Sequence, residues 1–162
     1  MQNAKDTFYI TLRNRLTTVN PLRTMTLRAV TRPGILVEEA EAFMAELPLD
    51  VFVLRWTKLD VDTQLAQPLA QMTCEIHYAT AGTQDNSGLD RGRALEEMDD
   101  EILRLLCPFS ATKTNYAQMP AVAMETSVFW SQATFAPITT VRERVGRVAT
   151  INVFAFQEQG EQ

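Results

Sequence analysis

The sequence has few of the side chains that usually carry out chemistry in proteins. Its 162 residues include one histidine and two cysteines, which leave little material for a His/Cys metal site or a histidine-dependent catalytic triad. Only six glycines are present, and no GxxxxGKS/T, GxGxxG, GxSxG or HExxH pattern occurs. We therefore expect no catalytic residue, no metal site and no cofactor, and we expect that the protein is not an enzyme.

Positive charge and long apolar runs are also scarce. The chain has 15 Lys and Arg residues against 20 Asp and Glu residues, and the net charge of −5 excludes a whole-protein basic footprint for nucleic acid. No apolar run approaches the roughly 18 residues of a membrane-spanning helix, and the first residues lack the apolar segment of a secretory signal. We expect a protein made in a cytoplasm, without a membrane partner, whose two cysteines are small buried residues rather than a disulfide.

What the chain does contain is a regular pattern of apolar residues. Phe8, Leu12 and Leu16 recur every four residues and predict an amphipathic helix over about 4–19. A second apolar stripe, which a proline ends, predicts another helix over about 90–107.

Strands are predicted where apolar and polar residues alternate or where apolar residues run together. These stretches are 24–30, 35–39, 51–56, 72–78, 122–134 and 147–156. The first two are expected to form a hairpin through a turn at Arg32-Pro33-Gly34. The irregular stretches 57–71 and 109–121 are expected to be long loops.

The order of these elements predicts an α+β fold. Helices and strands do not alternate regularly, which argues against a doubly wound α/β sheet. We expect one domain over 1–156, with a mainly antiparallel sheet, two helices packed on one of its faces and a polar tail over 157–162.

One predicted strand carries a polar set formed by Glu75, His77 and Tyr78. Glu75 and His77 lie two residues apart and therefore share a strand face, where such a pair could transfer protons. The favoured interpretation is a polar strand face at a surface or interface. The alternative is a small-molecule binding protein or enzyme that uses these three side chains.

Charge is unevenly distributed along the chain. Residues 1–33 contain six basic and one acidic residue, a balance of +5, whereas residues 34–62 contain two basic and seven acidic residues, a balance of −5. These charges could pair within the chain, or the basic part of one subunit could meet the acidic part of the next and close a ring. The subunit-interface candidates are Arg13, Arg28, Arg32, Glu38, Glu39 and Glu41.

The order of segments over nearly the whole chain resembles the phage tail terminator, or tail-completion, family, which includes caps of phage tail-like particles. The segments are FYITLRNRL, RAVTRPGILVEE, DVFVLRW, MTCEIHYAT, LDRGRALEEMDDEILRLL and RVATINVFAF. This resemblance implies a homohexameric ring that caps the tail tube, stops its polymerisation and provides the docking face for the head. It also implies a location at the head-proximal end of the virion tail and assembly in the host cytoplasm.

The same resemblance implies partners for the ring. They are the tail tube protein and the head–tail connector proteins, with DNA only as cargo through the lumen. Mobile arms suit such docking, and the candidate docking residues on them are Asp60, Asp62, Asp85, Asn86, Arg142 and Arg144. A head–tail connector component is the alternative within the same class of particle.

Overall fold

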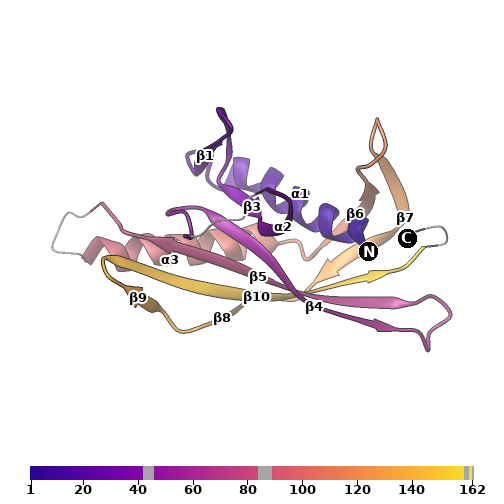
Figure 1. Cartoon of the computed structure of the whole chain (residues 1–162). Helices are drawn as coiled ribbons and strands as arrows, with labels where there is room; N and C mark the ends of the chain where they lie inside the picture. The colour runs from indigo at the N-terminus through magenta and orange to yellow at the C-terminus, as the bar shows by residue number, and fades with distance from the viewer. Residues whose placement is uncertain (42–45, 84–88, 159–160, 162) are drawn as a thin grey trace.

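The structure is a computed structural model that describes residues 1–41, 46–83, 89–158 and 161. It confirms the α+β fold: helices pack on a large, mainly antiparallel sheet (Figure 1). One cluster of buried side chains draws on both long helices and on most strands of this sheet, so the described elements share a core.

Two long helices occupy the predicted positions. Helix α1 (Gln2–Val19) buries the predicted stripe of Phe8, Leu12 and Leu16. Helix α3 (Leu89–Leu106) buries five apolar residues along one side and ends just before the cis Cys107-Pro108 peptide bond. The prediction of helices over 4–19 and 90–107 is therefore confirmed within two residues at every boundary. A third, short helix, α2 (Glu38–Glu41), follows the first strand of the main sheet.

The main sheet has the strand order β3-β4-β5-β10-β7-β6, and β8 and β9 add to the free part of β10. Its strands are β3 (Ile35–Val37), β4 (Phe52–Asp62), β5 (Leu69–Thr80), β6 (Ser110–Asn115), β7 (Val122–Trp130), β8 (Thr134–Phe135), β9 (Thr139–Val141) and β10 (Arg144–Phe156). All pairs are antiparallel except β3 with β4. A separate two-stranded ribbon consists of β1 (Thr24–Leu27) and β2 (Val30–Pro33).

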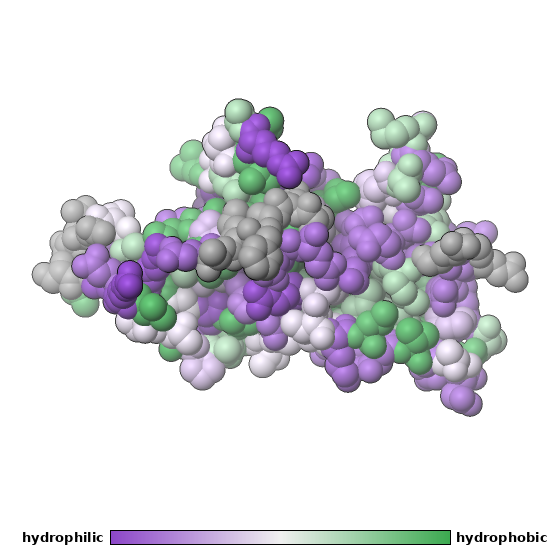
Figure 2. Space-filling model, in the orientation of Figure 1, coloured by the Kyte–Doolittle hydropathy of each residue, from purple (hydrophilic) through white to green (hydrophobic). Residues whose placement is uncertain are grey.

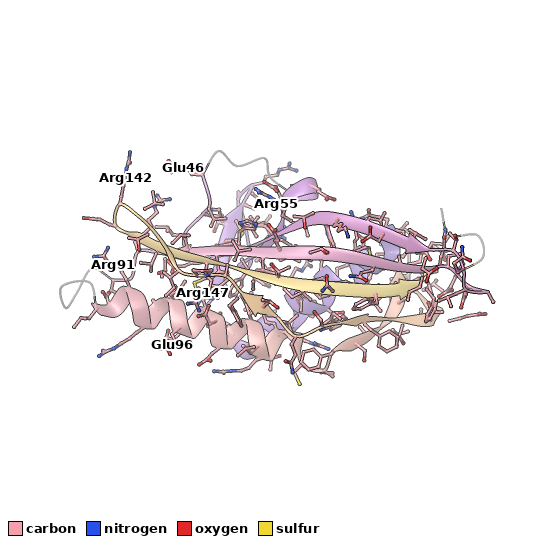
Figure 3. The ribbon with its side chains drawn as sticks, turned by 90° about the horizontal axis from the view of Figure 1, so that it is seen from below. Glu46, Arg55, Arg91, Glu96, Arg142 and Arg147 are labelled. Carbon is pink, nitrogen blue, oxygen red and sulfur yellow. The ribbon has the colours of Figure 1, made fainter. Side chains whose placement is uncertain are left out.

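Both long helices pack against the same face of the main sheet. Phe8 of α1 meets Trp56 and Trp130 edge-on, with ring centroids 5.8 and 5.2 Å apart. From α3, Asp99 reaches Tyr78 and Arg147, whose positions are paired across β5 and β10. Seen from the opposite side, β4, β5 and β10 lie side by side with no described helix over them (Figure 3).

Two predicted loops contain strands instead. The stretch 57–71 forms the ends of β4 and β5 and the turn between them, because Leu59 and Val61 alternate with charged residues and the two segments pair with each other. The stretch 109–121 contains β6, which pairs with β7.

The observed N-terminal hairpin also differs from the predicted one in the position of its turn and in its strands. Its turn lies at Arg28-Ala29, within the predicted first strand, and not at Arg32-Pro33-Gly34. The following strand, β3, leaves this ribbon and pairs in parallel with β4.

Candidate functional site

Four hairpins project from the packed core and carry most of the exposed large apolar side chains. Figure 1 shows β1–β2 and β6–β7 rising on the helix side, and β4–β5 extending to one end of the sheet. The fourth, β9–β10, lies at the other end. The exposed apolar residues on these hairpins and their flanks are Leu22, Val30, Leu59, Val61, Leu65, Phe109, Met119, Val122, Phe129, Ile138 and Val141. Exposed apolar side chains that gather on projecting elements mark surfaces for protein contacts.

The longest of these projections is the β4–β5 arm. A β-bulge between Trp56 and Lys58 changes the register, so that Leu59 and Val61 lie on the helix-covered face beside fully buried Met72 and Ala70 of β5. Leu59 is 50% exposed and Val61 is 43% exposed, because α1 does not extend over this end of the sheet. The rows of apolar side chains that are buried at β5 therefore end in solvent-exposed side chains at β4. Figure 2 shows apolar side chains gathered where Figure 1 draws this half of β4.

The outer edge of the same stretch is open. Strand β3 pairs only with residues 52–54 of β4, and among the described residues no strand pairs with the outer edge of 57–62. Unpaired backbone groups at a strand edge are a template for pairing with another chain.

The edges of the two terminal strands in the sheet order, β3 and β6, are covered by side chains of α1. At β6, the backbone N–H of Thr114 donates to the Thr7 hydroxyl over 2.9 Å, and Arg15 donates to the carbonyl of Ser110 over 3.4 Å. At β3, the Tyr9 hydroxyl donates to the carbonyl of Ile35 over 3.3 Å. The described sheet therefore has covered edges at β3 and β6, an open edge at the arm, and unpaired outer edges at the short strands β8 and β9.

The tip of the β1–β2 hairpin is strained. Its two turn residues, Arg28 and Ala29, have φ angles of 50° and 64°, which a two-residue type I′ turn requires and which Asn-Gly usually supplies. A residue with a Cβ atom costs roughly 1–2 kcal/mol in this left-handed region. Both side chains are exposed, so the strained turn places the Arg28 side chain in solvent at the end of the projecting β1–β2 ribbon.

The predicted acidic interface residues already have partners within the chain. Arg55 donates two hydrogen bonds to Glu38, which lower the pKa of the Glu38 carboxyl although partial desolvation opposes this. Lys5 lies 3.6 Å from Glu39. The side chain of Glu41 lies outside the described residues. Glu38 and Glu39 thus take part in intramolecular ion pairs, as the internal-pairing alternative requires.

The predicted basic interface residues differ in their surroundings. Arg32 donates to the Tyr9 hydroxyl and, over 3.3 Å, to the carbonyl of Ile35. The guanidinium of Arg13 lies over the Tyr9 ring, 6.0 Å from its centroid. Arg28 is exposed at the hairpin tip. Arg13 and Arg32 therefore share Tyr9 as a contact, whereas Arg28 projects into solvent at the hairpin tip.

The four docking candidates that the structure describes lie on two separate hairpins. Asp60 is 2.5 Å from Lys58 on β4, and Asp62 accepts a hydrogen bond of 2.9 Å from the backbone of Gln64 in the arm's turn. Arg142 occupies the turn between β9 and β10, with φ 55° (Figure 3). Arg144 lies 3.7 Å from Glu46. Asp85 and Asn86 lie outside the described residues.

The polar set of Glu75, His77 and Tyr78 is split between the two faces of β5. Glu75 Oε2 and His77 Nε2 are 2.8 Å apart on the face without a helix. The Tyr78 hydroxyl points to the other face and donates to Asp99 of α3, which also accepts from Arg147. Burial and the Asp99 carboxylate both raise the pKa of Tyr78 above its ordinary value. The three side chains thus form no common site.

Several buried polar anchors were not predicted from the sequence. Lys113 of β6 is fully buried and donates to the carbonyl of Phe156 over 2.7 Å and to Glu161 over 2.6 Å. Glu101 of α3, at a position between the helix's apolar contacts, accepts from Arg23. A charged residue within an apolar stripe was the available signal for Glu101, whereas nothing in the local sequence marks Lys113 as buried.

Residues 1–41, 46–83, 89–158 and 161 hold no group of three or more His, Cys, Asp and Glu side chains placed to bind a metal ion. No helix in this part of the chain is long and apolar enough to span a membrane.

No protein-family model matches the chain, and no curated protein matches it. The hairpins and the open β4 edge are therefore the features from which a function can be argued.

Proposed function

We propose that this chain is a structural subunit of a phage tail or tail-like particle, of the tail-terminator kind. In this proposal six copies form a ring that caps the tail tube, stops its polymerisation and provides the docking face for the head. The chain acts through its surfaces, and its partners are its own copies, the tail tube protein and the head–tail connector proteins. DNA passes through the lumen only as cargo.

The observation that carries this proposal is the placement of exposed apolar residues on projecting hairpins. Met119 and Val30, at the ends of two of these hairpins, are 95% and 62% exposed. A folded chain gains nothing from apolar side chains held in water, but each can be buried when a neighbouring subunit covers it, at about 25 cal/mol per Å² of apolar area. Hairpins that reach past the core provide such contacts without rearrangement of the core.

The charges fit this role in two ways. A ring whose subunits each carry −5 at neutral pH repels a DNA backbone and therefore does not grip it during passage. Arg28 and Arg142 lie in the turns of two different hairpins, where each could meet an acidic surface of a neighbour or of the tube.

The test is the mass and shape of the assembly. We expect native mass spectrometry to give six chains and electron microscopy to give rings that bind the ends of tail tubes and limit their length. A chain that stays monomeric at high concentration and leaves tube length unchanged would contradict the proposal. Rings found against the portal instead of the tube would favour a head–tail connector component.

Variants at the hairpin tips test the surface itself. We expect Val30→Ser combined with Met119→Ser to weaken ring assembly, because both side chains would be buried at contacts between subunits. The matched control is Leu103→Ser, since Leu103 is 47% exposed but lies on α3. A ring that tolerates the hairpin variants as well as it tolerates the control would remove the hairpins from the interface.

A further inference from the structure

We propose that the open edge of β4, residues 57–62, pairs antiparallel with the same edge of a second copy of this chain, around a two-fold axis at Leu59. This contact goes beyond the ring described above. It is isologous, so it joins chains, or whole rings, in pairs.

The first argument is that this edge is open, whereas the edges of the two terminal strands in the sheet order, β3 and β6, are covered. The backbone groups of β6 and β3 are engaged at Thr114, Ser110 and Ile35 by side chains of α1. A head-to-tail contact in which β4 of one copy pairs with β6 or β3 of the next would have to displace those side chains. Pairing of β4 with β4 displaces nothing that the structure describes.

The second argument is that the edge is complementary to itself. In an antiparallel pair centred on Leu59, Lys58 of each copy lies opposite Asp60 of the other, and the two Leu59 side chains lie opposite each other. Within one chain the Lys58 ammonium and the Asp60 carboxylate are 2.5 Å apart on a solvent-exposed face, so both charges are available to a second strand. Opposite charges directly across an antiparallel pair stabilise it, and like charges destabilise it.

The third argument is that the pairing covers apolar surface. Leu59 lies on the face that continues the core row through Met72, and Val61 continues the row through Ala70. A second arm placed edge to edge would extend the Leu59 row across the axis to the other Leu59, and it would place each Val61 opposite Thr57 of the other copy. It would bury part of the side chains that are 50% and 43% exposed in the single chain.

Charge reversal provides the first test. In Lys58→Asp, residue 58 of each copy is an Asp that faces Asp60 of the other copy. In Asp60→Lys, residue 60 of each copy is a Lys that faces Lys58 of the other copy. Each variant alone should therefore lose the pairing. We expect the mass of the assembly, measured by native mass spectrometry, to halve in each variant. An equimolar mixture should regain the full mass as heterodimers, because each Asp then faces a Lys. Arg93→Asp and Glu96→Lys make the same changes of net charge on exposed positions of α3 and should leave the mass unchanged.

A disulfide at the axis provides the second test. In a Cys107→Ser background, Leu59→Cys should crosslink two copies rapidly, because directly opposed residues lie about 4.5–5.5 Å apart between Cα atoms, within disulfide range. Val61→Cys is the matched control on the same face. The proposed register places its two copies about 13 Å apart along the strands, and it should not crosslink.

The two tests separate this contact from the ring. If single rings of six form but neither variant changes the mass and Leu59→Cys does not crosslink, the β4 pairing is refuted while the ring proposal stands. If pairs of single chains form and respond to the variants but rings do not, the ring proposal fails and the β4 pairing stands. Equal crosslinking at positions 59 and 61 would refute the register.

Discussion

Removing the Glu161 carboxylate should cost the fold about 3 kcal/mol. Lys113 is fully buried, and its ammonium group has three oxygen partners: the carbonyl of Phe156 at 2.7 Å, Glu161 at 2.6 Å and Glu158 at 3.7 Å. Breaking a buried ion pair by removing one partner typically costs about 3–5 kcal/mol, because the remaining charge stays buried. We take the lower end because Glu158 remains near the ammonium.

The measurement is urea unfolding of Glu161→Ala, Lys113→Met and the double variant. For a chain of this size, a loss of about 3 kcal/mol corresponds to a fall in Tm of roughly 6–12 °C. The double variant should be more stable than Glu161→Ala, because it no longer buries an unpaired charge. As a control, Glu46→Ala breaks an exposed ion pair with Arg144 and should cost less than about 1 kcal/mol.

Two results would refute this reasoning. A loss below about 1 kcal/mol in Glu161→Ala would mean that Lys113 reaches water or another acceptor. A double variant no more stable than Glu161→Ala would mean that the cost comes from the detached C-terminal segment and not from the buried ammonium.

The effect also has a defined pH dependence. Burial raises the pKa of Glu161, but the hydrogen bonds and charges around it, chiefly from Lys113, lower it more, so the net shift is downward. A lowered pKa in the folded state means that the stabilisation is complete above the ordinary pKa of glutamate, about 4.3, and is lost as the pH falls through the lowered value. The stability difference between the wild-type chain and Glu161→Ala should therefore narrow in strong acid and stay constant near neutral pH.

Three smaller predictions concern the turn, the thiols and one phenol. Arg28→Asn with Ala29→Gly should relieve about 1 kcal/mol of strain and slow hydrogen exchange in β1–β2, and unchanged exchange would mean that the turn is not strained. Ellman's reagent should label one thiol per folded chain and two in urea, because Cys107 is exposed whereas Cys74 is buried and its pKa is raised, chiefly by burial. Comparison with Tyr78→Phe in an absorbance titration should show no Tyr78 phenolate at pH ~10, where an ordinary tyrosine is half ionised.

The parts of the fold that the sequence predicted well are those in which burial repeats at a fixed spacing. The stripe through Phe8, Leu12 and Leu16 is fully buried, and the helix has nearly the predicted bounds. Cys74 and Cys107 form no disulfide, as expected, but Cys107 is exposed and not buried, because it lies just past the end of α3. The two cysteines therefore differ in burial because of their positions along their elements and not because of their residue type.

The arm was missed because its strands are held by pairing and not by burial. Residues 57–62 of β4 are all exposed, and their alternation of charged and apolar side chains, which is typical of a strand, covers only Lys58 to Asp62 before a polar turn. Its partner stretch on β5 supplies the hydrogen bonds, and no local pattern in β4 reveals that partner. The turn at Arg28-Ala29 was missed for a related reason: neither residue favours the left-handed conformation that the turn requires.

The open edge and the covered edges have one structural origin. Helix α1 crosses the sheet, with Tyr9 reaching β3, Thr7 and Arg15 reaching β6, and Phe8 filling the core between them. The arm extends past the end of this helix, so its edge receives no such cover. An edge left open at β4, with the edges of β3 and β6 covered by the helix, is selective among these three strands: it permits pairing at β4 and hinders growth of the sheet through β3 or β6. For a subunit proposed to end a polymer, this arrangement permits docking at β4 without extension of the sheet from its two terminal strands.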